Sequence, residues 1–137
     1  KEAMADNNLE INMDFIYYDY LTIDGGYMVG EQIIKRAKLP TAIICLNDEM
    51  AMGLIQSLTS NNIKVPEDIS IIGIDNIKMS KYYNPSLSTL NIPKREMGKK
   101  ASEILMKKIN KENLKKEDQL IVFPTNLIIR NSTKNIR

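Results

Sequence analysis

Residues 40–53 read Pro-Thr-Ala-Ile-Ile-Cys-Leu-Asn-Asp-Glu-Met-Ala-Met-Gly, and this stretch decides the fold of the chain. Its first part, residues 41–46, is a short apolar run with β-branched residues, the pattern of a strand buried on both faces of a parallel sheet. Asn47 and Asp48 end the run, and Asp48 can cap a helix that begins there. The sequence therefore predicts strand, turn and helix, with both residues at the sheet edge where open α/β folds bind ligands.

A second apolar run, residues 69–74, also ends in a polar pair, Asp75 and Asn76. Two interpretations stay open at this point. The pairs are strand-end turns with acidic helix caps, or they form a site for a polyol, since carboxylate and amide groups supply acceptors and donors to neighbouring hydroxyls.

Hydrophobic periodicity and turn residues predict the remaining elements of this α/β chain. Further strands are predicted at residues 11–18, 86–92, 120–123 and 127–130. Helices are predicted from Asp24 to just before Pro40, from Asp48 to about Asn61, at 77–83 and at 94–110.

Three glycines, Gly25, Gly26 and Gly30, resemble part of a phosphate-binding loop. Their spacing fits neither G-x-G-x-x-G nor a loop ending in G-K-[ST], so we expect them to allow tight helix packing instead.

Composition narrows the classes of function. The chain has 137 residues, 43% of them hydrophobic, and a net charge of +2, which indicates one domain or part of one and no concentrated basic surface for nucleic acid. There is no histidine, and the single cysteine, Cys45, lies inside an apolar run, so histidine-dependent triads and ordinary zinc sites are disfavoured. We expect no enzyme activity, no cofactor, no metal and no membrane segment. We also expect a fragment, because the chain does not begin with methionine.

Four motifs together resemble one protein family. They are P-T-A-I-x-x-x-N-D-E-M-A-x-G, V-P-E-D-I-S-I-I-G-I-D-N, P-x-L-S-T-L and the terminal L-I-I-R-N-S-T. In this order they are similar to the LacI/GalR family of bacterial transcriptional regulators, over residues 9–133.

The resemblance implies the second lobe of a periplasmic-binding-protein-like type I effector domain, with a parallel sheet flanked by helices. Residues 1–92 would belong to this lobe. Residues 93–123 would be a crossover helix and strand of the absent first lobe, and residues 124–137 would return to the second lobe and end in the tail.

The resemblance also implies site residues. Asn47 and Asp75 match positions that hydrogen-bond the effector, Ile44 matches a position that packs on effector rings, and Leu21 matches one that is often aromatic. An aliphatic side chain at position 21 lacks the stacking surface that sugars favour, which argues against a plain monosaccharide.

Three further residues, Met52, Ile55 and Tyr83, match positions at the family's dimer interface, and core packing is the alternative for them.

The leading hypothesis is therefore the effector-binding and dimerisation region of a cytoplasmic repressor. Its effector would be a sugar or sugar derivative, and operator DNA would be contacted only through an N-terminal domain missing from this chain. The alternatives are a solute-binding protein for sugar uptake, an enzyme on a similar sheet, and a regulator that responds to a phosphoprotein.

Overall fold

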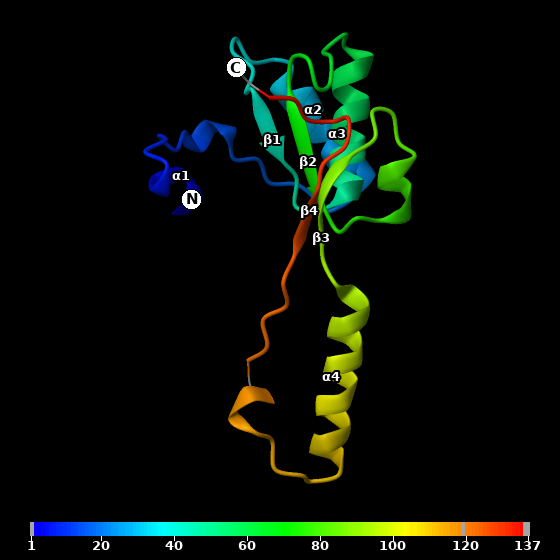
Figure 1. Ribbon diagram of the computed structural model, residues 1–137. Coiled ribbons are helices and arrows are strands. Elements are labelled where there is room, and N and C mark those ends of the chain that lie inside the picture. Colours follow the sequence, from blue (N-terminus) through cyan, green and yellow to red (C-terminus); the bar gives the residue numbers. More distant parts are fainter. Residues whose placement is uncertain (1, 119, 136–137) are drawn as a thin grey trace.

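The computed structural model describes residues 2–118 and 120–135, and its sheet has four strands in the order β1-β2-β3-β4 (Figure 1). Three strands run parallel: β1 (Ala42–Ile44), β2 (Ser70–Ile74) and β3 (Ser88–Asn91). The fourth strand, β4 (Asn126–Ile128), pairs antiparallel with β3. The α/β fold predicted from the apolar runs is confirmed, and the antiparallel edge strand makes the sheet mixed.

Two helices, α2 (Ile23–Ile33) and α3 (Asp48–Ser60), pack side by side against the sheet (Figure 1). Glycines allow the two backbones to approach closely. A Cβ atom on Gly26 would overlap the carbonyl oxygen of Met50, and one on Gly53 would overlap that of Ile23. The tight helix packing predicted for the glycines is confirmed.

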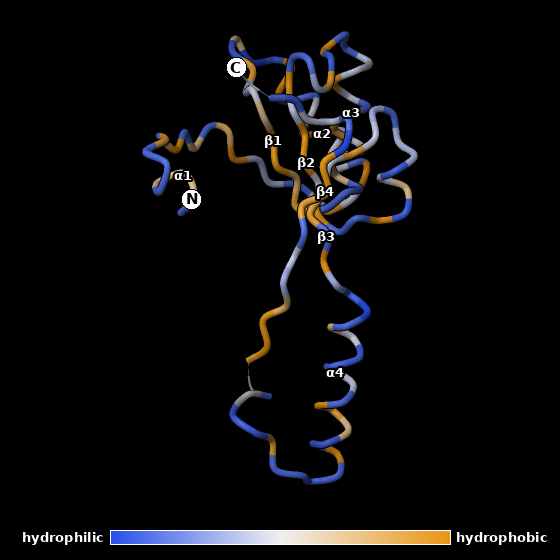
Figure 2. Tube along the Cα trace, viewed as in Figure 1, coloured by the Kyte–Doolittle hydropathy of each residue, from blue (hydrophilic) through white to orange (hydrophobic). Residues whose placement is uncertain are grey.

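The hydrophobic core lies between α2, α3 and the strands, where the apolar colour in Figure 2 is concentrated. Its fully buried aliphatic side chains belong to Ile33, Leu54, Ile55, Leu58, Ile69, Ile71 and Leu87. Each large side chain of this kind contributes about 1.5–3 kcal/mol when it leaves water. The α2–α3–sheet unit is therefore the stable part of the chain, and the candidate site is built on it.

The N-terminus of α2 differs from the prediction. Thr22 Oγ1 accepts a hydrogen bond from Gly25 N at 3.1 Å, so Thr22 is the N-cap and Asp24 lies in the first turn. The prediction that Asp24 caps this helix was wrong, because a threonine two residues earlier already satisfies the free amide.

The strand predicted at residues 11–18 is not formed. After α1 (Glu2–Asp6), the chain makes the 3-10 turn η1 (Met13–Phe15), in which the Asn12 side chain accepts from Asp14 N at 2.9 Å. Such a local side-chain bond competes with strand pairing. The Arg36 guanidinium, 5.3 Å from the centroids of both the Phe15 and Tyr17 rings, holds the following segment against the end of α2.

The helix α4 (Lys94–Ile109) is confirmed close to its predicted bounds, and it extends away from the sheet (Figure 1). None of its residues is buried in the described chain. After the turn η3 (Lys116–Asp118), residues 120–125 run back beside α4. The strand predicted at 120–123 is not formed, because these residues lie next to a helix and have no neighbouring strand among the described residues.

Candidate functional site

The polar pairs that follow β1 and β2 lie at one edge of the sheet. Ile44 is opposite Ile72 in the parallel register, and Asn47 and Asp75 follow these residues at the same interval along the chain. Because the carboxyl ends of parallel strands meet at the same edge of a sheet, both positions lie at the carboxyl edge. The two polar residues that the sequence singled out therefore lie at the same edge of the sheet.

Asn47 is the N-cap of α3. Its Oδ1 accepts from Met50 N at 2.8 Å, and its Nδ2 donates to Leu21 O at 3.0 Å. The prediction that Asp48 caps this helix was wrong by one residue. An amide side chain has two N–H groups and two lone pairs, so Asn47 retains one donor and one acceptor for a ligand.

Asp48 is instead a fully buried carboxylate that joins three parts of the chain. Its Oδ1 accepts from Thr89 Oγ1 at 2.5 Å, and its Oδ2 accepts from Ile77 N at 2.8 Å. Burial, followed by the charge of Asp48, raises the pKa of the Cys45 thiol to about 12. Cys45 is therefore an unreactive core residue, and Asp48 supports the loop that follows β2.

The loop after β2 is bent into an unusual backbone conformation. Asp75 has φ 113° and Asn76 has φ 48°, values that side-chain-bearing residues seldom adopt. Asp75 N donates to Leu90 O at 2.9 Å, which ties the bend to β3. The Asp75 carboxylate lies 3.2 Å from Lys94 Nζ, and this ammonium also donates to Asp75 O at 2.7 Å.

A partly buried cation stabilises the other side of this loop. The Arg130 guanidinium donates to Asn76 Oδ1 at 2.8 Å, to Ser80 Oγ at 3.1 Å and to Leu87 O at 2.6 Å. Asn76 Nδ2 in turn donates to Asn91 Oδ1 at 3.0 Å. The sequence patterns indicated no role for Lys94, Asn91 or Arg130, although an arginine within the apolar motif L-I-I-R-N-S-T indicates that acceptors for its guanidinium lie nearby in the fold.

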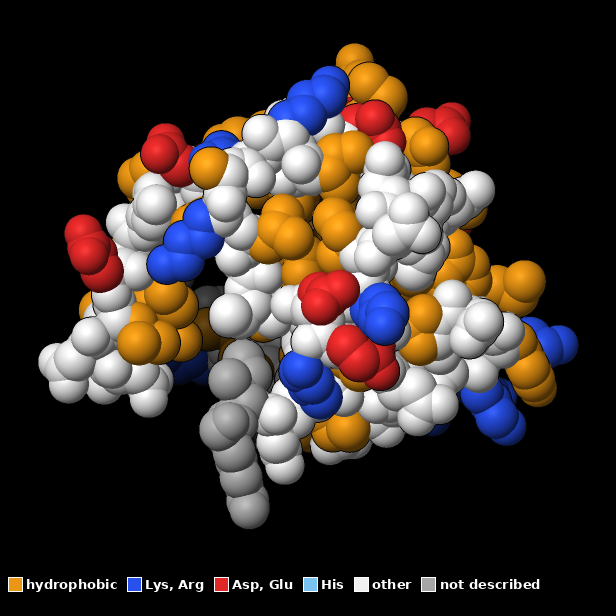
Figure 3. All heavy atoms as spheres, turned by 90° about the horizontal axis from the view of Figure 1, so that it is seen from above, with side chains coloured by type: hydrophobic (Ala, Val, Ile, Leu, Met, Phe, Trp, Pro, Cys, Tyr) orange, Lys and Arg blue, Asp and Glu red, His pale blue; other side chains and the backbone are white. Residues whose placement is uncertain are grey.

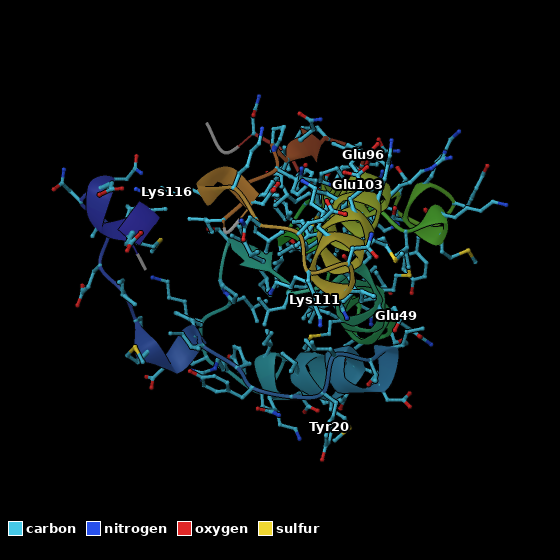
Figure 4. The ribbon with its side chains drawn as sticks, turned by 90° about the horizontal axis from the view of Figure 1, so that it is seen from below. Tyr20, Glu49, Glu96, Glu103, Lys111 and Lys116 are labelled. Atoms are coloured by element: carbon cyan, nitrogen blue, oxygen red, sulfur yellow. The ribbon has the colours of Figure 1, made fainter. Side chains whose placement is uncertain are left out.

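The predicted apolar contacts line a hollow of about 340 Å³ beside this rim. Leu21 and Ile44 are 54% and 74% exposed, so both side chains are available to a ligand. The other lining residues include Phe15, Tyr17, Tyr18, Asp19, Cys45, Leu46 and Met50. The Tyr17 hydroxyl is buried and has no hydrogen-bond partner among the described residues. Tyr20 points away from the body below α2 (Figure 4).

The arrangement offers a polar rim next to an apolar wall. Asn47 and Asp75 supply hydrogen-bonding groups, and Leu21 and Ile44 supply surface for an apolar face of a ligand. Among the described residues, no group of acidic, cysteine or histidine side chains is placed to hold a metal ion. The rim is suited to binding a small polar molecule.

The residues predicted at a dimer interface are mostly buried within the single chain. Met52 is 3% exposed and Ile55 is fully buried, and the Tyr83 hydroxyl donates to Met52 O at 2.9 Å. Core packing is the observed role of Ile55. A contact of these residues with a second chain stays a prediction.

The chain matches the model of the periplasmic binding protein-like domain over residues 1–133. The chain belongs to this family. It is 41% identical over 137 residues to the HTH-type transcriptional repressor PurR of Vibrio parahaemolyticus serotype O3:K6, covering 99% of this chain and 40% of that protein. The chain thus spans about two fifths of that relative's length.

Solved structures of LacI-type regulators have the same fold. A LacI-type transcription regulator from Bifidobacterium animalis subsp. lactis aligns with TM-score 0.87 and 31% identity, covering 98% of this chain and 48% of the other. A LacI family regulator from Lactobacillus casei with bound sucrose aligns with TM-score 0.82 and 27% identity, covering 96% and 48%. These similarities identify the chain as part of the effector-binding domain of a LacI-type regulator.

No helix in the described chain is both long and apolar enough to cross a membrane.

Proposed function

We propose that this chain is the ligand-sensing lobe of a LacI-type transcriptional regulator, and that its effector binds at the rim formed by Asn47 and Asp75. The observation that supports the proposal most directly is that these two residues follow neighbouring parallel strands at the carboxyl edge of the sheet. Ligands of open α/β sheets bind at this edge.

The chemistry of the rim favours a neutral polyol, which we propose is a sugar or sugar derivative. Asp75 can accept hydrogen bonds from hydroxyl groups, and Asn47 can both donate and accept. Leu21 and Ile44 would cover the less polar side of the ligand, which suits a substituted sugar better than a bare monosaccharide. The Lactobacillus casei relative with bound sucrose supports this class of ligand.

In the whole protein, we propose that residues 93–123 pack with a first lobe outside this chain. The regulator would act in the cytoplasm as a homodimer and would contact operator DNA through a separate N-terminal domain. Within this chain, the face shown in Figure 3 carries interspersed acidic and basic side chains and no broad basic patch, so it offers DNA little electrostatic attraction. The coding sequence upstream of Lys1 would distinguish this regulator from an uptake protein, since a regulator needs a DNA-binding domain there and an uptake protein needs an export signal.

Substitution of the rim residues in the intact protein tests the site. Asp75→Asn and Asn47→Ser are the suitable changes, because serine keeps the helix cap while it removes the amide donor. We expect each to weaken sucrose binding, or binding of the best ligand from a sugar panel, roughly ten- to hundredfold, as for a lost charge-assisted or amide hydrogen bond. Calorimetric titration measures the affinity.

The matched control is Lys78→Met, an exposed change outside this rim, which should leave affinity unchanged. If the folded Asp75→Asn and Asn47→Ser proteins bind as tightly as the wild type, the rim is not the effector site.

A further inference from the structure

A cation occupies an electrostatically unfavourable place at the start of α4. Lys94 is the first residue of the helix, where the aligned peptide dipoles favour a negative charge and disfavour a positive one. The preceding residue, Pro93, makes no side-chain capping bond. A lysine at this position therefore needs a compensating partner, and the Asp75 carboxylate, 3.2 Å away, provides it.

The contacts of Lys94 are also the ones that join α4 to the candidate site. Among the hydrogen bonds and ion pairs of the described residues, the other side-chain contacts that α4 makes outside itself run from Lys100 and Lys107 to Asp118, beyond the helix. The loop after β2 is fixed to β3 independently, through Asp75 N and Leu90 O. Among the described side chains, that of Lys94 is the one that links Asp75 directly to the helix.

We propose that Lys94 is a positioning residue of the effector site: its ammonium fixes the Asp75 carboxylate and holds the first turn of α4 to it. This inference rests on the proposed function of Asp75. Two of the three ammonium donors point to Asp75 acceptors, at 2.7 Å to its carbonyl oxygen and 3.2 Å to its carboxylate. The carboxylate keeps further lone pairs for ligand hydroxyls.

The placement of Lys94 also determines which ligands suit the site. A neutral hydroxyl can share the carboxylate with the ammonium, whereas a cationic ligand group would have to displace it. The site therefore selects neutral ligands over amines. A ligand at Asp75 would also contact the residue pair that holds α4, so occupancy of the site and the position of the helix are coupled.

Amide hydrogen exchange in the intact, ligand-free protein tests the link without knowledge of the effector. The reporter is the Met97 amide, which donates to Pro93 O at 3.0 Å and is released when the first turn of α4 opens. We expect Lys94→Met and Asp75→Asn each to speed its exchange roughly two- to fivefold, the range for a partly exposed ion pair. The double variant should exchange no faster than either single one, and Lys94→Arg should restore near-wild-type exchange.

The helix dipole alone makes the opposite prediction, because removal of a cation from the first turn should stabilise α4 and slow exchange. Lys99→Met, further along the same helix, is the matched control and should leave the rate unchanged. Slower or unchanged exchange in Lys94→Met, or additive effects in the double variant, would overturn the proposal. Because no ligand is present, this result is independent of whether Asp75→Asn weakens effector binding.

Discussion

Replacement of Asp48 by alanine is the sharpest test of how this fold supports its candidate site. Asp48 is fully buried and accepts hydrogen bonds from Thr89 Oγ1 at 2.5 Å and Ile77 N at 2.8 Å. A hydrogen bond to a charged group contributes about 1.5–3 kcal/mol, so the loss of two should lower the free energy of unfolding by about 3–6 kcal/mol. That is a large part of the roughly 5–15 kcal/mol by which a domain is stable.

Urea denaturation followed by circular dichroism measures this change, with Glu49→Ala as the control. Glu49 is exposed in the same first helical turn, so its removal costs only the dipole interaction, about 0.3–1 kcal/mol. Thr89→Val gives a second test should Asp48→Ala fail to fold. It removes one of the two Asp48 bonds together with the bond from Asn76 N to Thr89 Oγ1, 3.2 Å long, and should lower the free energy of unfolding by about 2–4 kcal/mol. If Asp48→Ala and Glu49→Ala lower the midpoint equally, the buried carboxylate does not hold the loop as described.

Two further predictions concern helix packing and pH. Gly26→Ala should lower the free energy of unfolding by about 1–3 kcal/mol, because its Cβ would overlap the carbonyl oxygen of Met50. Gly98→Ala has open space around its Cβ and should raise that free energy by about 0.5–1 kcal/mol. Thermal unfolding of the two variants measures both changes. Hydrogen bonds, first of all from Lys107, lower the pKa of Asp118, so its contribution to stability is present above the ordinary aspartate pKa and is lost as the pH falls through the lowered value. An NMR titration of the Asp118 carboxyl carbon should show this lowered pKa, and Lys107→Met should bring it back towards the ordinary value.

Local patterns predicted the elements of the core and the edge of the sheet at which we propose the site. The apolar runs that became β1 and β2 are interrupted by polar pairs at the point where parallel strands end, and this alone placed Asn47 and Asp75 at one edge. The glycine spacing in α2 excluded a phosphate loop and indicated close helix packing. These features depend on residues that are near one another in sequence.

One error and one omission arose where partners distant in sequence decide the outcome. The choice between Asn47 and Asp48 as the cap depends on Thr89 and Ile77, which give the Asp48 carboxylate a better place inside the fold. The apolar periodicity of residues 48–60 does not indicate the contacts of Asp48 with Thr89 and Ile77. The ion pair of Lys94 with Asp75 also joins residues 19 apart in the chain. The helix dipole disfavours a lysine at a helix N-terminus, so the local sequence does not indicate the partner that Lys94 needs.

The contrast between α3 and α4 shows which helix is held by contacts within this chain. The inner face of α3 is buried, and opening that helix would expose Leu54, Ile55 and Leu58 to water, at about 1.5–3 kcal/mol each. In the described chain α4 buries none of its residues and is held by ion pairs near its two ends, which salt screens and which contribute far less. Segments with few buried contacts open first. Within this chain α3 is therefore the rigid element beneath the rim, whereas the position of α4 depends on its ion pair with Asp75 and on the first lobe with which we propose that it packs.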